Sequence, residues 1–186
     1  MSANYSRHSD QELYAAFKQS GKERDAAFRE LFSRYERRVY VFCLRLTGNP
    51  EDAADIFQET FTRFYRQTQK DERVSNLLAY LLTSARNVFL NSKRNTVPWS
   101  PFEDEMVVSH APMYERTELL NMIGSALELL DTPYREAFIL RFYEGLSYKE
   151  MSSVTGDTVA SLKIRVMRAK DRIRSILSPY ISDVMK

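Results

Sequence analysis

Residues 145–174 read GLSYKEMSSVTGDTVASLKIRVMRAKDRIR and carry the signals of a short helix, a tight turn and a longer helix. Ser147 and Glu150 form a capping box, in which the hydroxyl and the carboxylate each satisfy a free backbone amide at a helix start. Gly145 suits the left-handed residue that ends a preceding helix. Residues 155–157 (TGD) then break the short helix, and this order of elements predicts a helix-turn-helix.

The longer helix, which Asp157 or Thr158 can cap, has one apolar side and one basic side. The apolar side, which we expect to pack against the shorter helices, comprises Val159, Leu162, Val166, Ala169, Ile173 and Ile176. Between Thr158 and Ser175 lie six basic residues and one acid, Asp171, a net charge of +5. The whole chain carries only +2, so its positive charge is concentrated on this helix.

The outward side of this helix has a pattern that suits duplex DNA. At roughly 100° per residue, the crest holds Ala160, Ser161, Ile164, Met167 and Arg168, with Lys163, Lys170 and Arg174 on one flank and Arg165 and Arg172 on the other. Flanking cations suit the two phosphate backbones, and a small, partly apolar crest suits base edges in the major groove. A solvated amphipathic helix without a ligand is the alternative, but it does not explain the short capped helix, the turn glycine and an exposed Ile164 together.

The rest of the chain is also predicted to be helical. Only five glycines and six prolines occur in 186 residues, and three of the prolines fall between residues 95 and 112, where no helical period is sustained. Earlier helices are expected over about 10–19, 28–46, 50–69 and 76–93, with caps at Ser9, Asn49 and Ser75, and later ones near Leu119 and from Thr132. We therefore predict an all-α protein of two small helical domains joined by a flexible linker.

One face of the helix predicted over 50–69 is acidic. It carries Asp52, Asp55 and Glu59, with Gln58 beside them. Carboxylates at a helix start are mildly stabilising in any protein, so the acids need no function. If they have one, we expect this face to meet a basic protein surface.

One line of polar side chains runs along the helix predicted over 76–93, opposite its leucines. The line consists of Tyr80, Thr83, Asn87, Asn91 and Arg94. An aromatic ring, amides and a guanidinium can stack on and hydrogen-bond unpaired bases, which is how single strands are usually recognised. An ordinary polar helix face explains the same line, so the pattern alone leaves both interpretations open.

Three segments in this order resemble the extracytoplasmic-function (ECF) subgroup of bacterial sigma factors. Residues 27–67, which include DIFQETF, resemble the sigma-two domain, residues 77–94 resemble its promoter-reading helix, and residues 127–174 resemble the sigma-four domain. The resemblance covers almost the whole chain. It implies a sigma-two-like domain over 1–95, a linker over 96–113 and a sigma-four-like helix-turn-helix domain over 114–186.

The resemblance implies a dissociable initiation subunit that binds bacterial core RNA polymerase and promoter DNA. Asp52, Asp55, Gln58 and Glu59 would dock on polymerase. The melted minus ten element would be captured by Tyr80, Thr83, Asn87, Asn91 and Arg94, with a flipped base in the loop 70–76. The upstream (minus thirty-five) element would be read by Ser161, Lys163, Ile164, Arg165, Arg168 and Arg172. An anti-sigma protein is a further expected partner. The linker acids Glu103 to Glu105 would mimic RNA inside polymerase or simply stay solvated.

Other classes of protein lack support in the sequence. No glycine-rich phosphate loop or Cys-His pair suggests an enzyme, and the buried-stripe position of Cys43 suits a core residue. His8 and His110 are far apart, so we expect no metal and no cofactor. No apolar run approaches the ~18 residues of a membrane span, so we expect a cytoplasmic protein without membrane insertion. An autonomous helix-turn-helix repressor or activator is the main alternative, and an adaptor that binds only proteins is a third.

Overall fold

The computed structural model describes residues 5–67, 74, 76–95 and 115–184, with backbone alone for 67, 94–95, 115–119 and 181–184. The described chain is helical and contains no strand: η1 (Tyr5–Arg7), α1 (Asp10–Phe17), α2 (Lys22–Thr47), α3 (Pro50–Gln67), α4 (Leu77–Asn95), α5 (Glu115–Glu128), α6 (Thr132–Phe138), η2 (Ile139–Tyr143), α7 (Tyr148–Thr155) and α8 (Val159–Val184). The predicted all-α fold is confirmed. The linker acids Glu103 to Glu105 and most of the loop 70–76 lie outside the described residues.

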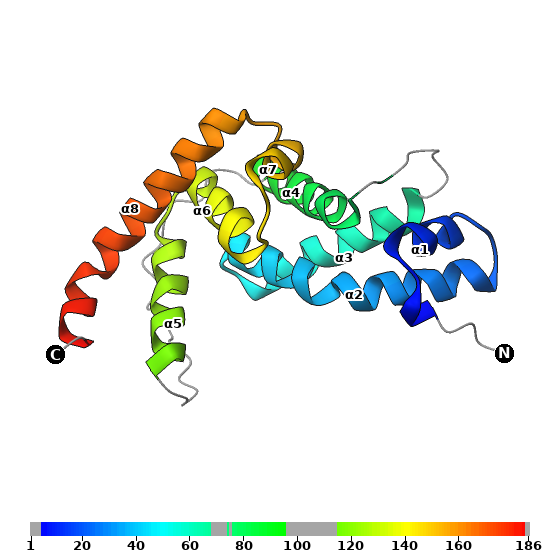
Figure 1. Cartoon of the computed structure of the whole chain (residues 1–186), viewed down its shortest axis with the longest axis horizontal. Coiled ribbons are helices and arrows are strands. Elements are labelled where there is room, and N and C mark those ends of the chain that lie inside the picture. Colours follow the sequence, from blue (N-terminus) through cyan, green and yellow to red (C-terminus); the bar gives the residue numbers. More distant parts are fainter. Residues whose placement is uncertain (1–4, 68–73, 75, 96–114, 185–186) are drawn as a thin grey trace.

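The first domain is built on the long helix α2, against which η1, α1, α3 and α4 pack (Figure 1). Apolar side chains of α2 such as Leu31, Phe42 and Leu46 lie in the core. Seven apolar side chains of α4, opposite the polar line, are buried as well: Leu77, Leu78, Leu81, Leu82, Ala85, Val88 and Phe89. Cys43 is fully buried, and its burial raises the pKa of its thiol to about 12, so it behaves as a core residue.

The second domain is formed by α5 to α8, in which α6, α7 and α5 all pack against α8. Leu162, Val166, Ala169 and Ile173 of α8 are buried, as their spacing predicts. Val159 is an exception, because 37% of its surface is exposed at the start of the helix. α5 and the C-terminal half of α8 extend side by side away from the body of the molecule (Figure 1).

The predicted helix ends are mostly confirmed. Both capping boxes form, because the Ser9 and Ser147 hydroxyls accept from the amides of Glu12 and Glu150. One cap differs from the prediction by one residue, because the side chain of Asn76 accepts from the Ala79 amide at the start of α4, where Ser75 was expected. Of the two residues predicted to cap α8, Thr158 does so, because its Oγ1 accepts from the Ser161 amide, which leaves Asp157 free of capping.

The segment between α6 and α7 contains a π-helical turn, η2. The Glu144 amide donates to the carbonyl of Ile139 five residues earlier, 3.0 Å away, instead of four residues earlier. Gly145 follows with a φ of +70°, and the Leu146 amide reaches back to the Leu140 carbonyl at 3.0 Å, as in the predicted left-handed helix ending. The chain therefore turns sharply into the helix-turn-helix.

The two domains also pack directly against each other, which the sequence did not indicate. α4 lies against α7, and α2 contacts α5, α6 and η2, so buried residues of both domains form one hydrophobic cluster (Figure 1). Two ion pairs cross this interface. Arg86 of α4 donates to Glu136 of α6 at 2.6 Å, and Arg38 of α2 lies 3.1 Å from Glu144. In both pairs the glutamate side chain is almost fully buried.

Further contacts close the interface around these pairs. The Arg45 guanidinium lies 3.6 Å from the centre of the Tyr143 ring, and the Arg135 guanidinium donates to the carbonyl of Leu46 at the end of α2 at 3.2 Å. Burial raises the pKa of Glu136 and Glu144, although the arginines facing them act in the opposite direction. Each interface glutamate is therefore a desolvated acid that depends on a cation from the other domain.

Candidate nucleic-acid and protein interfaces

The outward face of α8 combines exposed apolar and cationic side chains. Ile164 and Met167 are 48% and 54% exposed, and Lys163, Arg168 and Arg172 are exposed around them, while Ser161 is half-buried. Ile164 and Met167 thus place apolar surface among the cations on one face of the helix. This arrangement suits a helix that enters a DNA groove and meets thymine methyl groups and phosphates.

Arg165 lies differently from the other predicted α8 residues. Its Nη1 and Nη2 donate to the two carboxylate oxygens of Asp157 at 2.6 and 3.0 Å, and its side chain is only 25% exposed. The projection along the helix put Arg165 on a flank, but the long side chain turns back toward the turn that precedes α8. The structure therefore gives Arg165 a partner within the protein.

Two aromatic rings support the cations of this surface, and sequence analysis did not single them out. Tyr148, at the start of α7, has the Arg141 guanidinium 5.1 Å and the Lys163 ammonium 5.9 Å from its ring centre. The ring of Phe142 lies 6.0 Å from the Lys170 ammonium in the same way. Such contacts orient long basic side chains. Tyr148 directly follows Ser147, the cap of α7, and this position is the sequence signal that could have identified it.

The acidic face of α3 is present, but its four predicted residues are not equivalent. Asp52, Asp55 and Gln58 are exposed, whereas Glu59 is half-buried and pairs with Arg63 at 2.6 Å on the same helix. Asn49 caps the helix as predicted and accepts from the amides of Glu51 and Asp52 at 2.8 and 3.1 Å. The unpaired acids near the helix start are thus the ones available to a partner.

A shallow aromatic groove of about 700 Å³ lies beside Gln58, between α2 and α3. Its lining includes Phe28, Phe32, Phe57, Phe61 and Tyr65. The rings of Phe32 and Phe61 meet edge to face with centres 4.8 Å apart, a favourable arrangement of two aromatic rings. Apolar residues at helical spacing indicate a buried face, and the spacing cannot show that part of this aromatic surface stays open next to the acidic face.

The polar line on α4 is partly accessible. Asn87 and Asn91 are exposed, and the side chain of Arg94 lies outside the described residues. Tyr80 is half-buried with its ring 5.9 Å from that of Phe64, and the Thr83 hydroxyl donates to the Ala79 carbonyl at 2.7 Å. The two amides therefore remain available for hydrogen bonds, while the tyrosine is oriented by the first domain.

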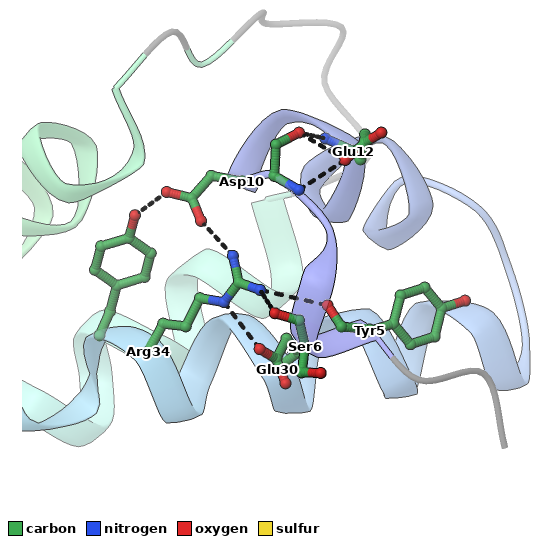
Figure 2. A network of polar contacts seen from close by, with 8 residues as sticks. Tyr5, Ser6, Asp10, Glu12, Glu30 and Arg34 are labelled. Carbon is green, nitrogen blue, oxygen red and sulfur yellow. Dashed lines mark hydrogen bonds and ion pairs between the residues drawn. The ribbon is translucent and has the colours of Figure 1, made fainter.

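A pocket of about 270 Å³ lies where the loop 70–76 joins α4, with walls from α1, α2 and α4 that include Asp10, Tyr14, Tyr35 and Asn76. Figure 2 shows how its acidic side is fixed: Arg34 donates to Asp10 at 3.0 Å and to Glu30 at 2.9 Å, and the Tyr35 hydroxyl donates to Asp10. Burial, followed by the bond to Asp10, raises the pKa of Tyr35. Asp10 of α1 lies 24 positions from Arg34 and 25 positions from Tyr35 in the sequence, so local patterns could not reveal the pocket.

Comparisons with known proteins match both domains. The family model of Sigma-70 region 2 matches residues 31–97, and that of Sigma-70, region 4 matches residues 120–173. The ECF RNA polymerase sigma factor EcfG of Rhodopseudomonas palustris is 30% identical over 140 residues, which cover 74% of this chain and 77% of that protein. The ECF RNA polymerase sigma factor SigE of Mycolicibacterium smegmatis is 29% identical over 162 residues, 83% of this chain, but the matched part spans only 63% of SigE.

A solved structure has the same fold. The sigma factor RpoE from Bartonella quintana, crystallised in complex with the anti-sigma factor NepR, is 24% identical and superimposes with a TM-score of 0.65 over 81% of this chain and 96% of RpoE. In the described part of this chain, no helix is long and apolar enough to span a membrane. No cluster of histidine, cysteine or acidic residues suited to a metal ion occurs there either.

Proposed function

Since the chain belongs to the ECF sigma factors of bacterial RNA polymerase, we propose that it binds core polymerase and directs it to particular promoters. The observation that carries the proposal is that one chain has two helices with exposed faces suited to DNA. α8 exposes cations and Ile164, and α4 exposes the amides of Asn87 and Asn91. A helix-turn-helix regulator that acts alone would not need the second of these surfaces.

α8 would read the upstream, minus thirty-five element. Lys163, Arg168 and Arg172 would contact phosphates or guanine edges, and Ser161 and Ile164 would contact base edges from the crest. The rings of Tyr148 and Phe142 would keep Lys163 and Lys170 extended toward the backbone. These contacts of α8 would be the first that the chain makes to a promoter, while the DNA is still double-stranded.

α4 would capture the minus ten element after it melts. Asn87 and Asn91 would hydrogen-bond unpaired bases, with Tyr80, Thr83 and Arg94 along the same line. The pocket beside Asn76 has acceptors at Asp10 and lies at the end of the loop 70–76, so it would suit a base extruded from the strand. Captured bases cannot re-pair, and this makes promoter opening favourable without any covalent step by this chain.

Polymerase would dock on α3. Asp52, Asp55 and Gln58 are exposed there, and the aromatic groove beside Gln58 offers apolar area next to the charges. Glu59, predicted with them, would first have to give up part of its ion pair with Arg63. An acidic rim beside an apolar groove suits a basic, amphipathic helical segment. Catalysis belongs to the polymerase, because the members of this family are regulatory subunits without an activity of their own.

The packed arrangement of the two domains would have to open in this function. The names of the two promoter elements put them about 25 base pairs apart, or roughly 85 Å along B-form DNA. In the structure α4 touches α7, and the side chain of Asn76 donates to Glu150 at 3.3 Å. While the domains are packed together, α4 and α8 cannot reach the two elements at the same time. We therefore propose that the domains separate. The complex of the similar RpoE with NepR supports an anti-sigma protein as a further partner.

Run-off transcription tests the proposal. Purified protein and sigma-free bacterial core polymerase are mixed with a pool of promoter fragments, and we expect promoter-specific transcripts that disappear with Asp55→Arg. Glu36→Arg is the matched control, because Glu36 is an exposed acid of α2 outside the proposed docking face. Transcripts that survive Asp55→Arg would contradict docking through α3. Absence of any transcript, together with tight and salt-sensitive duplex binding by the chain alone, would favour the autonomous regulator instead.

A further inference from the structure

The ion pair between Asp157 and Arg165 joins the turn of the helix-turn-helix to the second turn of α8. Both guanidinium Nη atoms donate to the carboxylate, at 2.6 and 3.0 Å, and the two side chains are 26% and 25% exposed. A two-pronged arginine-carboxylate contact fixes direction as well as distance. Arg165 is therefore held in one orientation before any DNA is present.

The carboxylate of Asp157 is not needed to shape the turn. Its backbone amide donates to Thr155 Oγ1 at 3.1 Å, and its carbonyl accepts from the Ser152 hydroxyl at 2.7 Å. Thr158 caps α8, and Gly156 supplies the left-handed residue with a φ of +77°. With the backbone fixed by these groups, the side chain of Asp157 serves Arg165.

A buried acid also senses this pair. The charges of Asp157 and Arg165 both influence the pKa of Glu136, which is 5% exposed on α6 and pairs with Arg86 at 2.6 Å. The acid that accepts directly from the Arg165 guanidinium is Asp157. Arg165 thus differs from Lys163 and Arg168, which are exposed on the same helix.

We infer that Asp157 is a positioning residue for upstream-element recognition, which withholds the Arg165 guanidinium from the DNA phosphates. This inference rests on the proposed function of α8. α8 would then bind DNA through its crest and its other cations. The attraction of the Arg165 guanidinium for phosphates, which does not depend on sequence, would be neutralised by Asp157 inside the protein. Discrimination between promoters improves, because phosphate contacts raise the affinity for all sequences equally.

The salt dependence of DNA binding distinguishes this role from a direct contact. Each phosphate contact contributes about 0.9 to the slope of log affinity against log salt, so a fourfold rise in salt costs about 3.5-fold in affinity per contact. If Arg165 is withheld, Arg165→Gln leaves the slope unchanged and Asp157→Asn steepens it by about 0.9. If Arg165 already binds a phosphate, Arg165→Gln flattens the slope by the same amount.

The experiment uses the full chain and a 30-base-pair duplex of mixed sequence, with affinity measured between 50 and 200 mM KCl. Asp171→Asn is the matched control, because it removes one acid from the same helix, where Asp171 makes only a 3.4 Å contact to the exposed Arg174. In a second measurement, the same variants are bound to core polymerase, and the upstream sequences that each holoenzyme selects from a randomised duplex pool are determined.

We expect Asp157→Asn to steepen the slope and to weaken the selection of upstream bases, and Asp157→Asn with Arg165→Gln to restore the wild-type slope. A turn that merely unfolds would lower both affinity and slope. The inference is overturned if Arg165→Gln flattens the slope by about one contact, or if Asp157→Asn behaves like Asp171→Asn in both measurements. A wild-type holoenzyme that selects no sequence would instead contradict the proposed function, and the inference with it.

Discussion

The ion pair that joins α4 to α6 makes a prediction about domain closure. Arg86→Ala removes the cation that faces Glu136 at 2.6 Å, where the two side chains are 17% and 6% exposed. Removing one partner of a buried pair costs about 3–5 kcal/mol, because the other charge stays desolvated. At 1.4 kcal/mol per factor of ten, the ratio of closed to open molecules should fall by a factor of roughly 100 or more.

Arg63→Ala is the matched control for this prediction. Arg63 also lies 2.6 Å from its glutamate, but the two side chains are 45% and 43% exposed and both belong to α3. An exposed pair of this spacing on one helix contributes about 0.3–0.5 kcal/mol. Since the residue type and the nitrogen-oxygen distance are the same, only burial and the crossing of the interface separate the two variants.

Energy transfer between two dyes measures closure directly. Cysteines introduced at the exposed positions Arg37 of α2 and Lys149 of α7 would carry the dyes. The native Cys43 can stay in place, because it is buried and its pKa is raised to about 12. We expect efficient transfer in the parent protein and in Arg63→Ala, and a marked loss of transfer in Arg86→Ala.

The pH dependence provides a second check on the same variant. Burial raises the pKa of Glu136 in the closed form, and loss of Arg86 removes the largest opposing influence, so this pKa rises further. A carboxyl with a raised pKa in the closed form favours closure at low pH and loses that contribution as pH rises through its value. Arg86→Ala should therefore regain transfer on acidification. Equal transfer in Arg86→Ala and Arg63→Ala across the pH range would refute the assignment of this pair as a link between the domains.

Two further predictions concern the second domain. Arg168→Ala should weaken binding of the holoenzyme to an upstream-element duplex by about 1–3 kcal/mol if the guanidinium pairs with a base, and leave its affinity for core polymerase unchanged; equal losses in both binding measurements would argue against a DNA role. Ser147→Ala should cost about 1 kcal/mol in the free energy of unfolding by denaturant, because it removes the cap of α7. The same change should move the pKa of Glu150 upward toward its ordinary value, since the Ser147 hydrogen bonds hold it low, and a titration of Glu150 by NMR that shows no change would contradict this.

Features set by neighbouring residues could be predicted from the sequence. The inner stripe of α8, the two capping boxes and the left-handed Gly145 depend on residues within about one turn of each other, and the structure has them, apart from the exposed Val159 at the start of the stripe. The cap of α4 shifted by one position, from Ser75 to Asn76, because neighbouring polar residues compete for the same amides. At α8, Thr158 is the one of the two predicted residues that caps. The DNA and polymerase contacts of the named residues remain predictions.

Features that depend on distant residues could not be predicted. Arg38 and Glu144 are 106 positions apart, and Arg86 and Glu136 are 50 apart, so no local pattern pairs them. Arg165 shows a different limit. Projection along a helix gives the direction of the Cα-Cβ bond, but a long arginine can turn its charged end through several rotatable bonds toward a nearby acid. The acid itself, Asp157, was one of the two residues expected to cap the helix.

The π-helical turn η2 determines which side chains of the second domain face α2. One extra residue in this turn rotates everything after it by roughly 100° relative to an uninterrupted α-helix. Tyr143 and Glu144 occupy the end of that turn and meet Arg45 and Arg38 of α2. A change in length of a single codon in η2 would direct both side chains away from α2 while the sequence of α8 stayed unaltered. Evolution could therefore adjust how firmly such a chain closes independently of which promoters it reads.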